Sequence, residues 1–257
     1  MNIRACLYIV VIFFVGIRAG YSISEEEALD SFAAANDSYV EGNIPKALFS
    51  YKSLLDKGFE SPALYYNLGN AYYKSNKYAL SIWSYEKTLL LNPNHKEAKT
   101  NLALANRSVS DKIQELPRVA WWYYWQKFKA LFPLSIWVLF SVLSVWAACM
   151  GLYFFLMNKS PKSRRIGLFM GIVSISFFVF FHAISWHKDH RIKHSNTAII
   201  ISTDVYVKNA PEEDGADAFI VHSGLKVHLL DIIGDWYKIR LADGKTGWVK
   251  KNEIKNI

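Results

Sequence analysis

The sequence predicts a multidomain membrane protein that combines an α-helical repeat module, a two-helix transmembrane hairpin and a small all-β barrel. Two apolar runs, 134–157 and 166–186, contain no Lys, Arg, Asp or Glu, and His182 is their only strongly polar residue. Each run is long enough, at about 1.5 Å per residue, to cross a hydrocarbon core about 30 Å thick. Self-similarity with a period of about 34 residues precedes the first run, and an alternating pattern starts at Ala198, after the second.

The first 22 residues are predicted to be a secretory signal peptide. Arg4 precedes an apolar stretch at 5–15, and small residues lie around Ala19, Gly20 and Ser22. We predict cleavage after Ser22. An uncleaved segment that stays as an anchor would also leave the following module exported.

Residues 23–115 are predicted to form the repeat module, with repeats at 28–61 and 62–95. Placing Asn36 over Asn70 also places Tyr51 over Tyr85. The second copy resembles the tetratricopeptide repeat through the run Tyr65-Tyr66-Asn67-Leu68-Gly69-Asn70-Ala71-Tyr72-Tyr73, followed by Tyr85-Glu86-Lys87 and Leu91-Asn92-Pro93. Two repeats bury little core, so a capping helix is expected at 96–113. Gly69 and Ser81 are expected where the paired helices approach closely.

The resemblance implies that peptides bind on the face lined by the first helix of each pair. The matching positions are Phe32, Asn36, Tyr39, Tyr66, Asn70 and Tyr73. The asparagines match positions with which some family members clamp a partner's C-terminal carboxylate, but the basic residues of that clamp are absent. An aromatic peptide groove is therefore expected, and the alternative is that these rings only pack between helices.

Residues 116–132 are predicted to form an interfacial aromatic segment. Its membrane-interface residues are Trp121, Trp122, Tyr124 and Trp125, followed by Lys127 and Lys129. Indole and phenol side chains prefer the headgroup level, because the ring is apolar while its polar group seeks water. A partner-binding aromatic patch is the alternative.

The two spans are assigned to 133–157 and 166–186, joined by a cytoplasmic loop at 158–165. This loop carries Lys159, Lys162, Arg164 and Arg165, and short basic loops stay on the cytoplasmic side. Both flanking modules are therefore expected outside the cytoplasm. Basic residues also flank the other ends of the spans, which weakens this signal.

Residues 187–197 are predicted to be a linker containing three histidines. His187, His190 and His194 have i, i+3, i+7 spacing, which on a helix would gather three imidazoles able to hold a metal ion. The simpler interpretation is a basic juxtamembrane segment beside lipid headgroups. No metal or other cofactor is expected.

The tail, 198–257, resembles the bacterial SH3-like domain. The matching segments are Val205–Pro211, Gly224-Leu225-Lys226-Val227, Asp235-Trp236-Tyr237-Lys238-Ile239 and Asp243-Gly244-Lys245-Thr246-Gly247-Trp248-Val249. Tyr206, Trp236 and Trp248 are candidates for a ligand surface, although at least one tryptophan is expected in the core. Tyr206 and Lys208 stand where the family usually has asparagine and arginine.

No motif for enzyme chemistry is found: there is no GxSxG, P-loop, HExxH or CxxCH, so the protein is predicted not to be an enzyme. The net charge is +8 and the pI about 9.3, but the basic excess lies largely at the membrane flanks. Nucleic acid is therefore not an expected partner. A membrane adaptor that binds other proteins is the simplest hypothesis.

The order of parts along the chain resembles the BatE proteins of the bacterial aerotolerance operon. That resemblance implies residence in the bacterial inner membrane, with the repeats and barrel in the periplasm, and von Willebrand A-type Bat membrane proteins as partners in envelope or oxidative-stress tolerance. Two alternatives remain. One is a peptidoglycan-binding tether that recruits a cell-wall enzyme. The other is a metal or haem assembly factor that uses the histidine cluster.

Overall fold

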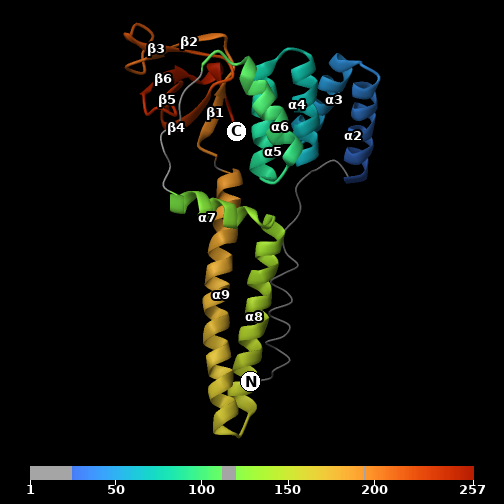
Figure 1. Ribbon diagram of the computed structural model, residues 1–257, viewed down its shortest axis with the longest axis vertical. Coiled ribbons are helices and arrows are strands. Elements are labelled where there is room, and N and C mark those ends of the chain that lie inside the picture. The colour runs from blue at the N-terminus through green and yellow to red at the C-terminus, as the bar shows by residue number, and fades with distance from the viewer. Residues whose placement is uncertain (1–24, 112–119, 194) are drawn as a thin grey trace. The chain divides into compact units, whose positions relative to one another are not determined.

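The computed structural model describes residues 25–111, 120–193 and 195–257 (Figure 1). The expected signal peptide and the start of the aromatic segment, 116–119, lie outside the described residues. The chain divides into two compact units, Met1–Glu60 and Ser61–Ile257. The first unit contains α2 (Glu25–Val40) and α3 (Ile44–Asp56). The second contains α4 (Pro62–Lys74), α5 (Tyr78–Leu91), α6 (Lys96–Ala105), a 3-10 turn (Asn106–Ser108), α7 (Ala120–Ala130), α8 (Leu134–Met157), α9 (Pro161–Lys193), β1 (Thr197–Ile200), β2 (Asp204–Lys208), β3 (Asp217–His222), β4 (Lys226–Ile233), β5 (Trp236–Arg240), β6 (Thr246–Lys250), a second 3-10 turn (Lys251–Glu253) and β7 (Ile254–Asn256).

The helical pairs α2–α3 and α4–α5 use the same kind of turn. Gly42 has φ 82° between α2 and α3, and Asn76 has φ 58° at the equivalent position between α4 and α5. Glycine adopts this left-handed conformation freely, and asparagine is among the few other residues that tolerate it. Side chains also cap two helices. Asn43 accepts a hydrogen bond from a backbone N–H in the first turn of α3, and Ser61 accepts one from the first turn of α4. The repeat seen in sequence is therefore a repeat of local structure.

Close packing joins α4 to α5, as expected at Gly69 and Ser81. The Ser81 hydroxyl donates to the Gly69 carbonyl oxygen at 2.9 Å. A Cβ atom at Gly69 would lie 2.6 Å from the Tyr85 ring, so only glycine fits there without displacement. The capping helix, expected over 96–113, is shorter than expected. Here α6 ends at Ala105 and a 3-10 turn follows, in which Asn106 and Ser108 have a lower helix propensity than the alanine and leucine residues before them.

Helices α8 and α9 form an antiparallel hairpin (Figure 1). The buried residues of α8 are Trp137, Ser141, Ser144 and Gly151. Small residues let the two backbones approach, and a Cβ atom at Gly167 would lie 2.8 Å from the Gly151 carbonyl oxygen. The seam is therefore formed by small residues over much of its length, with an aromatic cluster around Trp137 at one end.

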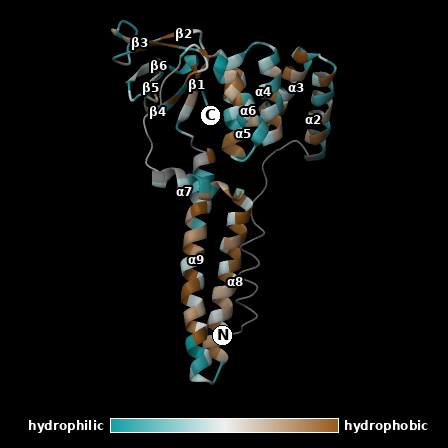
Figure 2. Ribbon diagram, viewed as in Figure 1, coloured by the Kyte–Doolittle hydropathy of each residue, from teal (hydrophilic) through white to brown (hydrophobic). Residues whose placement is uncertain are grey.

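Both helices are long and apolar enough to cross a membrane (Figure 2). The second helix is longer than the expected span of 166–186, because α9 begins at Pro161 and continues to Lys193. It therefore includes the end of the expected loop, 158–165, and much of the expected linker, 187–197. An apolar run shows only which part of a helix is suited to contact lipid. Backbone hydrogen bonding continues through the charged residues beyond that run, and proline is tolerated in the first turn of a helix, so α9 is longer than the run at both ends.

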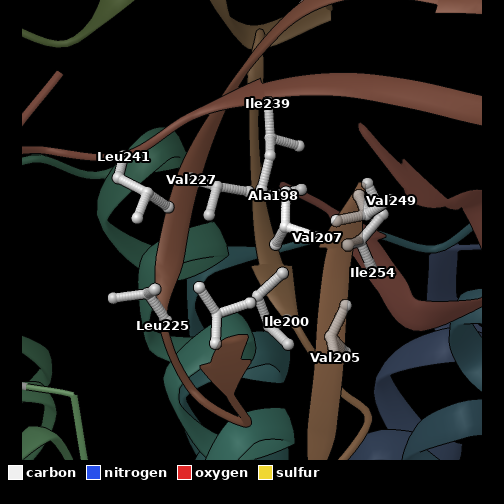
Figure 3. Close-up of a cluster of buried hydrophobic side chains, with 11 residues drawn as sticks. Ala198, Ile200, Val205, Val207, Leu225, Val227, Ile239, Leu241, Val249 and Ile254 are labelled. Atoms are coloured by element: carbon white, nitrogen blue, oxygen red, sulfur yellow. The ribbon is translucent and has the colours of Figure 1, made fainter. Parts of the chain in front are cut away.

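The tail is an antiparallel β-sheet domain, as the alternating pattern predicts. Its seven strands have the order β3-β2-β6-β5-β4-β1-β7. One buried cluster contains side chains from both ends of this order, Val221 on β3 and Ile254 on β7. Figure 3 shows the cluster. The sheet therefore curls around its own core. The members of the cluster are Ala198, Ile200, Val205, Val207, Val221, Leu225, Val227, Ile239, Leu241, Val249 and Ile254.

Candidate functional site

The candidate groove residues of the first repeat lie on α2 and contact their own helix partner. Asn36 Oδ1 accepts a hydrogen bond from the Tyr51 hydroxyl at 2.8 Å. The Phe32 ring lies 6.1 Å from the Tyr51 ring. Burial, with a smaller contribution from Tyr39, raises the pKa of Tyr51 to about 12, so its hydroxyl stays protonated and donates at any physiological pH. Asn36 therefore has a structural role inside the repeat.

The second repeat has the same arrangement on α4. Asn70 Oδ1 accepts from the Tyr85 hydroxyl at 2.7 Å, and the Tyr66 ring lies 6.1 Å from the Tyr85 ring. Asn101 of α6 donates to Asn70 at 2.9 Å and to the Tyr66 hydroxyl at 3.3 Å. The capping helix therefore contacts the candidate groove. Asn101 is not among the residues predicted from sequence, although it lies on the helix expected to cap this surface.

Tyr39 and Tyr73 are the remaining candidates, at equivalent positions of α2 and α4. Both side chains are half-buried. The Tyr73 ring lies 5.4 Å from the Tyr78 ring in an edge-on contact. Within each repeat the aromatic and asparagine side chains are thus organised into a fixed surface. That surface offers apolar contact and a phenolic hydroxyl to a partner, and no basic side chain stands among the six candidates.

The three candidate ligand residues of the β domain share the outer face of the sheet. Trp236 lies opposite Lys250, and Trp248 lies opposite both Lys208 and Lys238. Directly opposed residues of adjacent strands point to the same face, and Tyr206 precedes Lys208 by two positions on β2. Lysine ammonium groups lie 5.7 Å from the Trp236 ring centre and 5.8 Å from that of Trp248. This face is therefore aromatic and cationic.

The connection between β2 and β3 is bonded to the same lysines. Lys208 Nζ donates to the Gly215 carbonyl oxygen at 3.0 Å and lies 2.7 Å from Asp217. Lys250 Nζ lies 2.6 Å from Glu213, and this bond lowers the pKa of the Glu213 carboxyl. Trp248 is only 7 % exposed, whereas Tyr206 is 54 % exposed. Trp248 is thus largely buried on the outer face of the sheet, and neither tryptophan belongs to the core cluster in which at least one was expected.

The repeat module and the β domain contact each other within the second unit, which sequence analysis left open. Trp83 of α5 is the centre of this contact, with 6 % of its surface exposed. Its indole Nε1 donates to the Asn256 carbonyl oxygen at 2.7 Å, and Lys255 Nζ lies 4.2 Å from its ring centre. Glu86, three residues further along α5, lies 2.6 Å from Lys226 Nζ on β4.

A second part of this interface joins Asp111 to His222 of β3. Asp111 accepts from the His222 backbone N–H and lies 2.7 Å from the imidazole Nδ1. The His222 Nε2 is 3.6 Å from Asp204. The hydrogen bond and charge of Asp111, and more weakly the charge of Asp204, raise the pKa of His222.

A raised pKa makes this ion pair pH-dependent. Its stabilisation is complete below the ordinary histidine pKa of 6.5 and is lost as the pH rises through the raised folded-state value. We therefore expect the melting temperature to fall between pH 6 and pH 9 by more in the wild type than in a His222→Gln variant. Thermal unfolding at a series of pH values measures this difference. Asp111→Asn serves as the reciprocal variant, and parallel pH profiles in all three proteins would contradict the assignment.

Helix α7 carries the candidate interface residues and lies between the repeat module and the apolar hairpin in the chain. Trp121 and Tyr124 are strongly exposed, at 72 % and 65 %, while Trp125 is half-buried and stacks on Trp121. The side chain of Trp122 lies outside the described residues. Exposed indole and phenol groups at the end of two apolar helices match the amphipathic pattern of a membrane interface.

The last carbonyl groups of this segment accept hydrogen bonds from three other elements. The Lys129 carbonyl oxygen accepts from Trp137 Nε1 of α8, at 3.3 Å, and from Lys188 Nζ of α9, at 3.1 Å. The Ala130 carbonyl oxygen accepts from Asn94, after α5, at 2.6 Å. Lys188 also donates to the Phe132 carbonyl oxygen at 2.7 Å. These bonds satisfy carbonyls that a helix end leaves without intrahelical partners.

The histidines after the second apolar run lie on a continuing helix. His187 and His190 are both exposed on α9, and His190 stacks on Trp186. His194 lies outside the described residues. Within the part of the chain that the structure describes, no group of three or more His, Cys, Asp or Glu side chains could hold a metal ion.

Comparison with known families supports the repeat. The family model of the tetratricopeptide repeat matches residues 62–95, the span of α4, α5 and the turn before α6. No curated protein matches the chain in sequence. A repeat of this family indicates a module for protein–protein interaction, and its position is the one expected for the second repeat.

Proposed function

We propose that the protein is a non-catalytic adaptor of a bacterial inner membrane, which presents the repeat module and an SH3-like barrel to the periplasm. The bonds from Lys188 to the Lys129 and Phe132 carbonyl oxygens carry this proposal. They join the end of α9 to the segment just before α8. The preceding and following modules then leave the hairpin at the same end, and so on the same side of a membrane.

The surface of the hairpin supports anchoring in lipid. Large apolar side chains on both helices are strongly exposed, for example Trp146 at 60 %, Leu156 at 65 % and Phe169 at 69 %. Contiguous apolar surface of this extent is unfavourable in water and favourable in a hydrocarbon core. The short basic connection at 158–165 favours a cytoplasmic position for the far end of the hairpin.

The proposed function of the exported repeat module and β domain is to bind other proteins. The tetratricopeptide match supports it, and Tyr39 and Tyr73 are the proposed contact points on α2 and α4. The order of signal, repeats, hairpin and β domain supports a Bat-type complex in which von Willebrand A-type membrane proteins are the partners. In this proposal the protein holds such partners beside the membrane in envelope or oxidative-stress tolerance.

The two alternative functions receive less support. A peptidoglycan tether would use the aromatic face of the β domain, but Trp248 is largely buried there. A metal or haem assembly factor would use His187, His190 and His194, of which the structure describes the first two, both exposed.

Affinity purification of the tagged protein from its native membrane, with crosslinking and mass spectrometry, tests the adaptor proposal. We expect von Willebrand A-type membrane proteins to be recovered. Recovery of cell-wall enzymes alone, together with binding of the purified protein to peptidoglycan sacculi, would overturn it in favour of the tether.

Two bait variants locate the binding surface. Tyr73→Ala removes a proposed contact on α4 and should reduce partner recovery several-fold. Phe49→Ala removes a 76 % exposed ring from α3, the second helix of its pair, and should leave recovery unchanged. Loss of the partner with Phe49→Ala and retention with Tyr73→Ala would move binding to the other helices.

A further inference from the structure

A cavity lies where the repeat module meets the membrane hairpin. It has a volume of about 280 Å³ and is bounded by the end of α5, by α7, by the first residue of α8 and by the last turns of α9. Its wall residues include Leu90 and Leu91 from α5, Leu134 from α8 and Ile192 from α9. A largely apolar cavity thus opens at the level where both apolar helices end.

The polar part of the wall is cationic. Its charged residues are Lys127, Lys129 and Lys188, its other polar residues are Gln126 and His187, and no Asp or Glu is among the described residues that line the cavity. Lys129 is only 5 % exposed, and its ammonium group lies 5.7 Å from the Trp125 ring centre. A lysine charge in such a poorly hydrated place acts more strongly on a nearby anion than an exposed charge does. The cavity therefore combines apolar walls with three lysines among its lining residues.

Lys188 links the two helices that form the polar side of the cavity. Its Nζ donates to the carbonyl oxygens of Lys129 and Phe132, so the side chain spans from α9 to the end of α7. Lys127 and Lys129 then approach from α7 while His187 approaches from α9. Residues of two helices thus line one opening, in contrast to a row of lysines along one exposed helix face.

We infer that this cavity binds the headgroup and glycerol region of an anionic phospholipid. The lysines receive the phosphate, the apolar wall receives the glycerol ester region, and the acyl chains continue along the exposed apolar surface of the hairpin. Charge complementarity selects an anionic lipid over a zwitterionic one, because each lysine near a membrane surface contributes about 1 kcal/mol with an anionic lipid. The cavity lies near the lower end of the size range of ligand pockets, about 300 Å³, and so accommodates part of a lipid molecule.

This inference rests on the proposed membrane anchoring and deepens it. A lipid held between α5, α7 and α9 would fix the repeat module to the membrane surface. The bound lipid would then act as part of the junction between the repeat module and the hairpin. Such a site would also make the interface between module and anchor depend on the lipid composition of the membrane.

Native mass spectrometry of the full-length protein in a non-ionic detergent tests the site. Phosphatidylglycerol and phosphatidylcholine are titrated separately, and soluble glycerol 1-phosphate is added as a competitor. We expect one tight site for phosphatidylglycerol and weaker binding of phosphatidylcholine. Glycerol 1-phosphate should compete poorly, since it lacks the part that contacts the apolar wall.

Three substitutions give matched comparisons. Lys127→Gln removes one charge, and Lys129→Met removes another while keeping a long apolar stem. Each should weaken the tight site about fivefold, as expected for about 1 kcal/mol. Lys159→Gln removes a charge from the exposed connection at the other end of the hairpin and should leave the tight site unchanged. Lys188 is avoided because it also bonds the end of α7.

The outcomes separate this inference from the proposed function. Release of the wild type from membranes by alkaline carbonate would overturn the membrane anchoring and the lipid site together. Retention in the membrane, with equal affinity for phosphatidylglycerol and phosphatidylcholine, would overturn the lipid site alone. Unchanged affinity in folded Lys127→Gln and Lys129→Met variants, or full competition by glycerol 1-phosphate, would also overturn it.

Discussion

Replacing Gly151 with alanine is expected to loosen the α8–α9 hairpin and to lower the melting temperature of the detergent-solubilised protein. A Cβ atom at this position would lie 2.7 Å from the Gly171 backbone nitrogen and 2.8 Å from the Gly167 carbonyl oxygen. Both obstacles are backbone atoms, so no side chain can rotate away. The helices must shift apart, and overpacking of this kind costs about 1–3 kcal/mol. Thermal unfolding followed by circular dichroism measures the loss.

Gly171→Ala is the matched control, because a Cβ atom there meets nothing within 4 Å. Both substitutions add one methyl group to a glycine inside an apolar helix. Alanine also has the higher helix propensity, by about 1 kcal/mol. Gly171→Ala should therefore be neutral or stabilising. Equal melting temperatures for the two variants would show that the close approach at Gly151 does not limit the hairpin.

The repeat was predictable from sequence because its packing is local. Asn36 and Asn70, with Tyr51 and Tyr85, recur at one spacing, and each asparagine accepts a hydrogen bond from the tyrosine of its own repeat. This regular spacing of asparagine and tyrosine indicates a contact between the two helices of one repeat. The same contacts assign the Oδ1 atoms of both asparagines to the repeat, so a partner carboxylate would have to accept from their Nδ2 groups.

The contacts between modules were not predictable in the same way. Trp83 lies on a largely buried helix, where an indole group has many possible neighbours, and its partner Asn256 is far away along the chain. Lys188 looked like one more basic residue beside a membrane span, yet its ammonium group caps carbonyls 56 and 59 positions earlier in the sequence. A single sequence without homologues gives no pairing information for such contacts.

The end of α7 is where these long-range contacts converge. Asn94 reaches it from the repeat module, Trp137 from α8 and Lys188 from α9. Within the second unit, α5 in turn contacts the β domain through Trp83. Packed elements therefore connect the β domain, through α5 and the end of α7, to the hairpin.

Trp83→Ala is expected to detach the β domain from α5 and to destabilise the protein by about 3–5 kcal/mol, the usual cost of truncating a buried tryptophan. The ring packs edge-on against Tyr65 at 5.6 Å and under the Lys255 ammonium at 4.2 Å. Hydrogen exchange of the full-length protein, measured by mass spectrometry, should show faster exchange in α5 and in β1 and β7.

Two further variants separate the contributions of this side chain. Trp83→Phe keeps an aromatic ring but leaves the Asn256 carbonyl oxygen without its indole donor, which should cost about 1–3 kcal/mol. Trp236→Ala removes a half-buried tryptophan from the outer face of the same domain and should leave exchange in α5 unchanged. If Trp83→Ala also left α5 unchanged, the interface would contribute little to stability, and the repeat module and β domain would act as independent binding units on a common anchor.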